Sequence, residues 1–400
     1  MLRRLTAAIL SLALIFTFTV LRPEASDSEY EAEQDANSGT GNDMLGATAL
    51  PISAKSAVLM DADSGTVLYS SNASEALPPA SVTKIMTLLL VCEALNDGSI
   101  KLDDSVRVSA NAASMGGSQI FLKEGEEFSV EELLKSAVIA SANDAAVALA
   151  ELIAGSEERF VTMMNDKAKA LGMKNTSFEN ATGLDEGVTR HLTSAYDIAL
   201  MSRELIKHEA VMKYSNVWQD SIRNGEFTLT NTNRLVRYYS GCTGLKTGST
   251  DKAGFCVSAT AKRDGMHLIA VIMGSETRDE RNNSARMLLD YGFANYGVYR
   301  DNECDLETVP VKKGISDGVT AYSTEFSILT DKSNLKSIEK RYDIPATVTA
   351  PIEKDAKIGE VIYTLNGSEI GRSDICVREG VERIRLYDIF VLLLSEIIAG

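Results

Sequence analysis

The sequence predicts an α+β protein in which an antiparallel sheet flanked by helices is followed by a small all-β domain. Two observations lead to this prediction. Strand-like apolar segments stand at both ends of the first three-quarters of the chain, with helical patterns between them, which favours one sheet built from both ends. From about Asn302 the pattern changes to short alternating segments separated by Gly, Asp and Pro. We therefore expect a larger domain over residues 51–300 and a small β-sandwich-like domain over residues 301–380.

The first fifty residues are expected to lie outside both domains. Met1–Arg4 is basic, Ala7–Val20 is apolar, and small residues follow, an order typical of a secretory signal peptide over residues 1–25. An uncleaved anchor is the alternative, although the apolar run is shorter than the roughly 20 residues that span a bilayer. Residues 26–50 are acidic and rich in Ser, Gly and Asn, which predicts a disordered linker.

Composition argues against several classes of function. The formal net charge is −16 and no basic stripe could neutralise phosphates, so we expect no nucleic-acid partner. The three histidines form no H-E-x-x-H pattern and the cysteines are not spaced like metal ligands, so neither a metal site nor a cofactor is expected. The five cysteines are odd in number and scattered, which predicts no disulfide framework.

The elements of the larger domain follow from local patterns. Two apolar strands around the turn Asp61–Gly65 predict a hairpin, and a helix is expected to begin at Ser81. A helical pattern from Val130 to Ile153 is interrupted at 140–144, where short polar residues are good at capping a new helix. The remaining elements are helices over 157–170 and 194–206, an antiparallel meander over 244–249, 255–261 and 267–273, and a helix over 280–293.

Ser81 and Lys84 form the pattern S-x-x-K where a helix begins. The apolar run Ile85–Val91 can carry that helix through a core. Residues three apart share one helical face, so a neutral amine could take the proton of the hydroxyl, and N–H groups at the helix start could stabilise an oxyanion. The pattern is weak alone, because 333–336 and 337–340 repeat it in a polar stretch and a capping serine near a solvated lysine is common.

Two later patterns could complete this chemistry. Ser141-Ala142-Asn143 could supply a hydroxyl that shuttles protons, although Ser109-Ala110-Asn111 repeats S-x-N. Lys246-Thr247-Gly248 occurs once and could hold an anionic substrate, with Gly248 on a predicted strand where a substrate backbone could approach closely. The alternative interpretation of Lys246 is a solvated strand lysine.

S-x-x-K, S-x-N and K-T-G in this order form the pattern of penicillin-binding proteins and class A β-lactamases. The chain resembles most closely the low-molecular-mass penicillin-binding proteins that are D-alanyl-D-alanine carboxypeptidases, serine peptidases of that superfamily. The similarity extends over 52–296, and its blocks are 79–87, 142–145, 171–176, 233–235 and 244–254. It implies a β-lactamase/DD-peptidase-like catalytic domain over 51–300, followed by the family's β domain and C-terminal tail.

The resemblance also implies residue roles. Ser81 is the nucleophile that forms an acyl-enzyme, and Lys84 is its general base. Ser141 relays a proton to the departing D-alanine, and Asn143 hydrogen-bonds the substrate peptide. Lys246 keeps Lys84 deprotonated by like-charge repulsion and helps to bind the terminal carboxylate.

Further binding residues follow from the same motifs. Thr247 is an additional donor to the carboxylate, and the backbone N–H groups of Ser81 and Ser249 form the oxyanion hole. Arg234 and Arg281 are expected carboxylate partners. Family members often carry His where this chain has Ser249, which should spare a hole built from a backbone N–H.

The expected substrates are peptidoglycan stem peptides ending in D-Ala-D-Ala, and β-lactam antibiotics are expected to bind. A DD-endopeptidase, a slow penicillin-binding sensor and a β-lactamase-like protein are the alternatives. A β-lactamase needs a carboxylate base, usually in an E-x-x-L-N block, whereas Glu179–Leu184 is similar to the carboxypeptidases. Release of D-alanine from a peptide would distinguish an enzyme from a sensor.

Residues 381–400 predict an amphipathic helix with a narrow polar side. Its apolar run is too short to span a bilayer, so we expect it to lie in the membrane interface and tether an exported enzyme to the outer face of the cytoplasmic membrane. The alternative is a helix packed on the protein's own β domain, because only Arg383 and Arg385 could attract anionic lipid. The side expected to be apolar comprises Leu386, Ile389, Phe390, Leu393, Leu394, Ile397 and Ile398.

Overall fold

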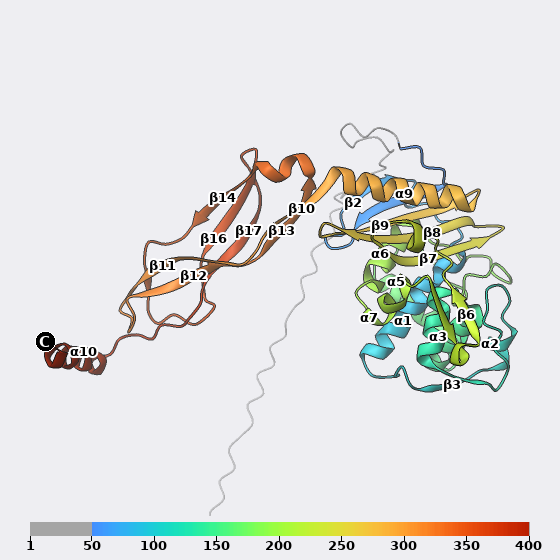
Figure 1. The fold of residues 1–400 in the computed structure, drawn as a ribbon, viewed down its shortest axis with the longest axis horizontal. Coiled ribbons are helices and arrows are strands. Elements are labelled where there is room, and N and C mark those ends of the chain that lie inside the picture. Colours follow the sequence, from blue (N-terminus) through green and yellow to red (C-terminus); the bar gives the residue numbers. More distant parts are fainter. Residues whose placement is uncertain (1–49, 400) are drawn as a thin grey trace, which may run out of the picture. The chain divides into compact units, whose positions relative to one another are not determined.

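The computed structural model describes residues 50–399. The predicted signal peptide (1–25) and the predicted linker up to residue 49 lie outside the described residues. The described chain forms an α+β domain followed by an all-β domain, which confirms the predicted fold class (Figure 1).

A five-stranded antiparallel sheet forms the centre of the α+β domain, with the strand order β2-β1-β9-β8-β7. Strand β1 pairs with β9, so segments from the two ends of the domain meet in one sheet, as predicted. The strands are β1 (Ser56–Asp61), β2 (Val67–Ser71), β7 (Cys242–Thr250), β8 (Gly254–Arg263) and β9 (Met266–Ser275).

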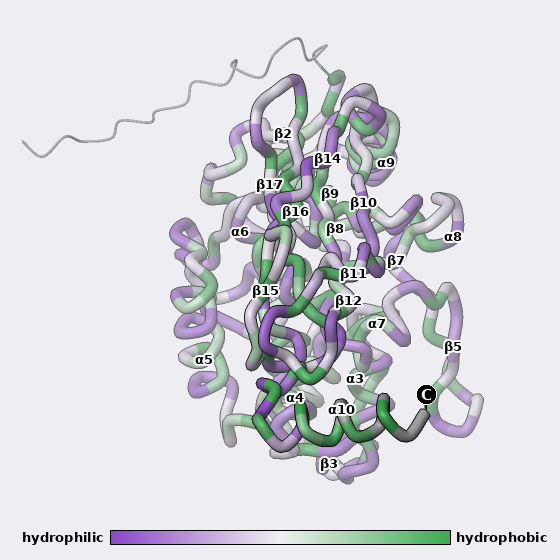
Figure 2. Tube along the Cα trace, turned by 90° about the vertical axis from the view of Figure 1, so that its left-hand side faces the viewer, coloured by the Kyte–Doolittle hydropathy of each residue, from purple (hydrophilic) through white to green (hydrophobic). Residues whose placement is uncertain are grey.

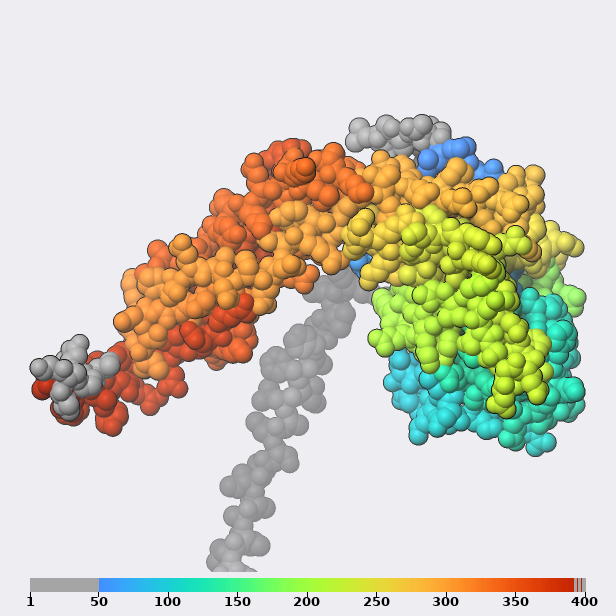
Figure 3. Space-filling model, in the orientation of Figure 1, coloured from blue at the N-terminus to red at the C-terminus, as the bar shows by residue number. Residues whose placement is uncertain are grey.

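Helices cover both faces of this sheet. Helix α9 (Arg278–Asn295) packs on β8 and β9 and lies beside β1 although the two are far apart in sequence (Figures 1 and 3). Helix α6 (Ala195–Leu205) packs on the other face, and α1 (Lys84–Asn96) packs against α6. A capping box between Thr277 and Glu280 begins α9, because each side chain accepts the backbone N–H of the other residue.

The α+β domain has further helices and two small two-stranded sheets. The helices are α2 (Ala110–Ser114), α3 (Val130–Ile139), α4 (Asn143–Ala154), α5 (Glu157–Ala170), α7 (Glu209–Ser215), α8 (Leu235–Tyr238) and the 3-10 turns η1 (Ala80–Thr83) and η2 (Arg223–Gly225). One two-stranded antiparallel sheet pairs β3 (Ser105–Arg107) with β4 (Glu127–Ser129), which follows α2 in the chain, and the other is the hairpin of β5 (Gln219–Ile222) and β6 (Phe227–Thr230). The sequence did not predict these two small sheets, because such short strands show too little alternation to be recognised.

The all-β domain contains a two-stranded and a six-stranded sheet. Strand β10 (Tyr296–Asp301) pairs with β13 (Phe326–Asp331), and the larger sheet has the order β14-β16-β17-β12-β11-β15. The rings of Phe326 and Tyr363 stack with centroids 3.8 Å apart in its core. The other elements are β11 (Cys304–Lys312), β12 (Gly318–Ser323), η3 (Lys332–Ser337), β14 (Ile338–Asp343), β15 (Val348–Thr349), β16 (Lys357–Leu365) and β17 (Ser368–Val377).

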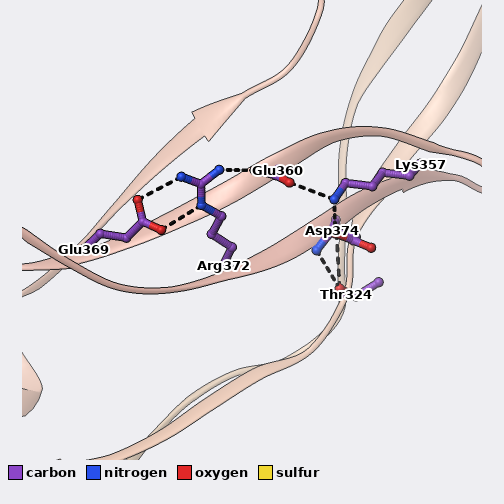
Figure 4. A network of polar contacts seen from close by, with 6 residues as sticks. All are labelled: Thr324, Lys357, Glu360, Glu369, Arg372 and Asp374. Carbon is purple, nitrogen blue, oxygen red and sulfur yellow. Dashed lines mark hydrogen bonds and ion pairs between the residues drawn. The ribbon is translucent and has the colours of Figure 1, made fainter. Parts of the chain in front are cut away.

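Charged side chains form a network on β16 and β17 (Figure 4). Arg372 binds Glu369 and Glu360, and Lys357 binds Glu360 and Asp374. Exposed ion pairs of this kind contribute about 0–1 kcal/mol each. The apolar core, not this network, is therefore the main source of the stability of the domain.

The last element is α10 (Leu386–Ala399). The segment before α10 is hydrogen-bonded to the turn after β11. Ile384 N–H donates to Lys313 O at 2.9 Å, and Ile315 N–H donates to Glu382 O at 3.0 Å. Within residues 50–399, no helix has both the length and the apolar character needed to cross a membrane.

Candidate active site

Ser81 lies in the turn that leads into α1. It was expected to begin the helix, but it lies inside η1, and the α-helix begins at Lys84. The Ser81 side chain caps no helix and instead accepts a hydrogen bond from Lys84 Nζ at 3.0 Å. The preceding Ala80 has φ +49°, a left-handed conformation that is uncommon for a residue with a side chain.

Lys84 is fully buried and its amine has three acceptors. They are Ser81 Oγ, Asn143 Oδ1 at 2.5 Å and the backbone oxygen of Thr182 at 2.9 Å. Burial lowers the pKa of Lys84 well below its usual value, the charge of Lys246 lowers it further, and Asp144 opposes both effects. A neutral amine held this close to a hydroxyl can act as a general base.

The S-x-N motif occupies the predicted break between α3 and α4. Ser141 has φ +60°, and Asn143 is the first residue of α4. Asn143 accepts from Lys84 and donates through Nδ2 to Gly116 O at 2.7 Å, while Ser141 Oγ accepts from Lys246 Nζ at 2.7 Å. The break therefore brings both motif side chains toward the two lysines.

The K-T-G motif lies on the edge strand β7. Thr247 Oγ1 donates to Thr232 Oγ1 at 2.8 Å, and Ser249 is exposed. A Cβ at Gly248 would lie 2.8 Å from Ser81 N, so only glycine lets this strand approach the nucleophile turn so closely. The strand edge and the turn together border a site where an extended peptide could bind.

Lys246 is buried, not solvated as its alternative interpretation required. Burial lowers the pKa of Lys246 to about 7, and the positive charge of Arg281 adds to this effect. Hydrogen bonds link Lys246 to Ser141 and Lys84 to Asn143, so two amines and two motif side chains form one polar cluster beside Ser81.

The two predicted arginines differ in exposure. Arg234 is exposed at the start of α8, where a charged ligand could reach it. Arg281 is buried on α9 and donates to Asn282 Oδ1 and, at 3.5 Å, to Cys256 O. Its effect on the cluster is electrostatic, through the pKa of Lys246.

Two contributors to the site were missed from the sequence. Thr182 contributes a backbone oxygen, which no side-chain motif could indicate. Asp144 accepts the backbone N–H groups of Ile120 and Leu122, which holds this loop against the first turn of α4. Asp144 lies in the family block 142–145, so the sequence did contain a signal for this residue.

Over residues 50–399, no cluster of three His, Cys, Asp or Glu side chains could hold a metal ion. All five cysteines are free.

Comparison with known proteins decides the family. A model of the family "D-alanyl-D-alanine carboxypeptidase" matches residues 44–277, and a model of the C-terminal domain of penicillin-binding protein 5 matches residues 293–383. The chain belongs to the D-alanyl-D-alanine carboxypeptidase family. It is a serine-type hydrolase of the low-molecular-mass penicillin-binding protein group, as the motifs indicated.

Relatives in this family match most of the chain. D-alanyl-D-alanine carboxypeptidase DacF of Bacillus subtilis is 46% identical over 338 residues, which are 82% of this chain and 86% of the relative. DacA of Escherichia coli is 32% identical over 341 residues, 82% of this chain and 84% of the relative. The chain thus spans most of the length of these family members.

Solved structures of penicillin-binding proteins superpose on this chain. Penicillin-binding protein 5 of Haemophilus influenzae superposes with a TM-score of 0.69 at 31% identity, covering 84% of this chain and 100% of that one. Penicillin-binding protein D2 of Listeria monocytogenes, solved in an ampicillin-bound form, covers 62% of this chain and 100% of its own with a TM-score of 0.57 at 31% identity.

Proposed function

We propose that the protein removes the terminal D-alanine from peptidoglycan stem peptides through an acyl-enzyme on Ser81. Ser81 Oγ attacks the carbonyl carbon of the penultimate D-Ala while Lys84 takes the hydroxyl proton. The peptide C–N bond breaks, the terminal D-alanine leaves as a protonated amine, and water then hydrolyses the ester. The observation that carries the proposal is the 3.0 Å contact between a hydroxyl and a buried amine whose pKa is strongly lowered.

Ser141 and Lys246 are proposed to act on the leaving side. Ser141 accepts from Lys246 at 2.7 Å and can pass a proton toward the departing amine. Lys246, with Thr247 and the exposed Arg234, supplies donors for the free carboxylate of the substrate. Asn143 orients the substrate peptide and Lys84 together.

The proposed oxyanion hole consists of the backbone N–H groups of Ser81 and Ser249. The close approach of Gly248 to Ser81 N supports it, because the two backbones converge where a carbonyl oxygen could accept from both. Arg281 is proposed to support carboxylate binding through its charge, since its guanidinium is buried.

The loop beside the nucleophile favours stable β-lactam binding over rapid turnover. Oε2 of Glu179 accepts the backbone N–H groups of Thr189 and Arg190, at 2.7 and 2.9 Å, which ties this carboxylate to its own loop. Thr182 contributes a carbonyl rather than a base that could activate water. A β-lactam that acylates Ser81 is therefore expected to remain bound for longer than in a β-lactamase.

We also propose that the protein is exported and attached to the outer face of the cytoplasmic membrane through α10. Apolar residues follow one another along this helix (Figure 2). Leu386, Phe390 and Ile397 are 87%, 60% and 75% exposed. Exposed apolar side chains of this kind favour insertion into a membrane interface.

Incubation with a muropeptide pentapeptide and, separately, with a penicillin tests the function. The proposal predicts catalytic release of free D-alanine together with slow loss of the penicilloyl adduct. Stable acylation without any release of D-alanine would instead identify a sensor.

A further inference from the structure

The imidazole of His191 connects the turn that carries Ser81 to the loop beside Lys84. Its Nδ1 accepts the backbone N–H of Glu179 at 2.9 Å, and its Nε2 lies 2.7 Å from Thr83 Oγ1. The ring is 5% exposed and packs edgewise on Phe178, with centroids 5.7 Å apart. Thr83 directly precedes Lys84, so the ring acts on the residue next to the general base.

The two partners determine the tautomer of the ring. A backbone N–H can only donate, so Nδ1 carries no proton. The neutral ring then has its proton on Nε2 and donates it to Thr83 Oγ1. Burial lowers the pKa of His191 to about 4, against the opposing charges of Glu179 and Asp185, so this neutral form persists at neutral pH.

The bridged loop forms part of the wall around Lys84. Asn180 Oδ1 accepts the N–H groups of Thr182 and Gly183, at 3.1 and 2.6 Å, which presents Thr182 O to the amine. A Cβ at Gly183 would lie 1.8 Å from Ala80 O, so the loop lies directly against the nucleophile turn.

We propose that His191 is a positioning residue for the general base: by joining Glu179 to Thr83 it keeps the loop 180–184 closed against Lys84 and keeps water from the amine. The inference rests on the proposed roles of Ser81 and Lys84. It adds a function for a side chain that lies outside the three motifs.

Loss of the His191 bridge should raise the pKa of Lys84. Burial is the main cause of the lowered pKa of Lys84. When the loop opens, water reaches the amine and replaces Thr182 O as an acceptor, so the burial effect weakens and the pKa rises. Lys246 and Asp144, the charged groups that act on Lys84, remain in place, so the shift reports the loop alone.

The test compares three variants of the full mature protein. His191→Leu removes both hydrogen bonds. His191→Gln keeps an acceptor for Glu179 N–H and a donor for Thr83. Phe178→Leu loosens the same pocket and leaves both bonds, so it is the matched control for packing. The readout is the rate constant of acylation by a fluorescent penicillin as a function of pH.

For His191→Leu we expect the acid limb of the pH–rate curve to move to higher pH by about one unit. On that limb the acylation rate constant should fall about tenfold, and the difference from wild type should shrink as the pH rises. His191→Gln should recover most of the rate, and Phe178→Leu should keep the wild-type limb. Thr83→Val removes the other partner of the bridge and should reproduce the shift if His191→Leu does not fold.

The proposal would be overturned if the acid limb stayed in place in both His191→Leu and Thr83→Val. It would also be overturned if the acylation rate constant fell by the same factor at every pH. Failure of the proposed function is separate, because it would appear as an unacylated wild-type protein or an acylated Ser81→Ala protein.

Discussion

At the residue scale, the site depends on two buried amines that repel each other. In the proposed mechanism Lys84 loses its proton to activate Ser81, and the charge of Lys246 favours this by lowering the pKa of Lys84. The pKa of Lys246 lies at about 7, partly because Arg281 is close. The pH dependence of the enzyme therefore reports on the pair rather than on either lysine alone.

Lys246→Ala should move the acid limb of penicillin acylation to higher pH by about one unit. Removal of the positive charge raises the pKa of Lys84, so a higher pH is needed to deprotonate it. The measurement is the acylation rate constant across the acid and neutral range. Lys246→Arg retains the charge and should keep the limb near its original position. A limb that stays in place in Lys246→Ala would show that Lys246 does not tune Lys84.

The sequence identifies the side chains of this site but not its backbone contacts. The three motifs could be recognised because they combine residue types that acyl transfer requires, and the fold brings their side chains into contact: Ser81, Lys84, Ser141, Asn143 and Lys246. The backbone oxygen of Thr182 leaves no such signal. His191 was visible as one of three histidines, but its two partners are distant in sequence and only folding brings them to the ring.

At the element scale, most of the long helices and the meander could be predicted from apolar runs and periods between recognisable boundaries. The side chains of Ser129, Ser156, Ser194 and Thr277 cap the starts of α3, α5, α6 and α9. The predicted start of α1 was wrong by one turn, because the 3-10 turn η1 precedes the helix and Ala80 adopts φ +49°. Local propensity cannot anticipate such a turn, which the packing of Gly183 and Gly248 against it maintains.

Gly183→Ala tests the contact between the loop and the nucleophile turn. A Cβ there would overlap Ala80 O, so the loop must move, and acylation should fall by about 100-fold. Gly187→Ala is the matched control, because Gly187 has a similar φ of +72° but no atom within 4 Å of a Cβ. Both variants carry a left-handed backbone cost of about 1–2 kcal/mol. Acylation rates and thermal unfolding of the two should be compared. Equal rates would mean that the contact does not position the site.

At the scale of the whole molecule, the all-β domain and α10 could be predicted from the sequence, but the contacts that hold the start of α10 could not. Hydrogen bonds join the segment just before α10 to the turn at Lys313. They link segments that are distant in the chain, so no local sequence pattern could indicate them. A shortened chain that ends after Arg385 keeps these bonds while it removes the helix.

Deletion of residues 386–400 should move the mature protein from the membrane to the soluble fraction and leave its activity on small peptides unchanged. Phe390→Asp in the full chain is the companion variant, because it places a charge on an exposed apolar position without shortening the protein. Fractionation and a peptide assay provide the measurement. Unfolding of the shortened protein, or its continued sedimentation with membranes, would contradict a membrane role for α10.

Mass spectrometry of the penicillin-treated protein can show which residue carries the acyl group. We expect one penicilloyl group per chain, located at Ser81 in the tryptic peptide of residues 56–84, and no adduct in Ser81→Ala. An adduct on another residue, or undiminished labelling of Ser81→Ala, would contradict this expectation.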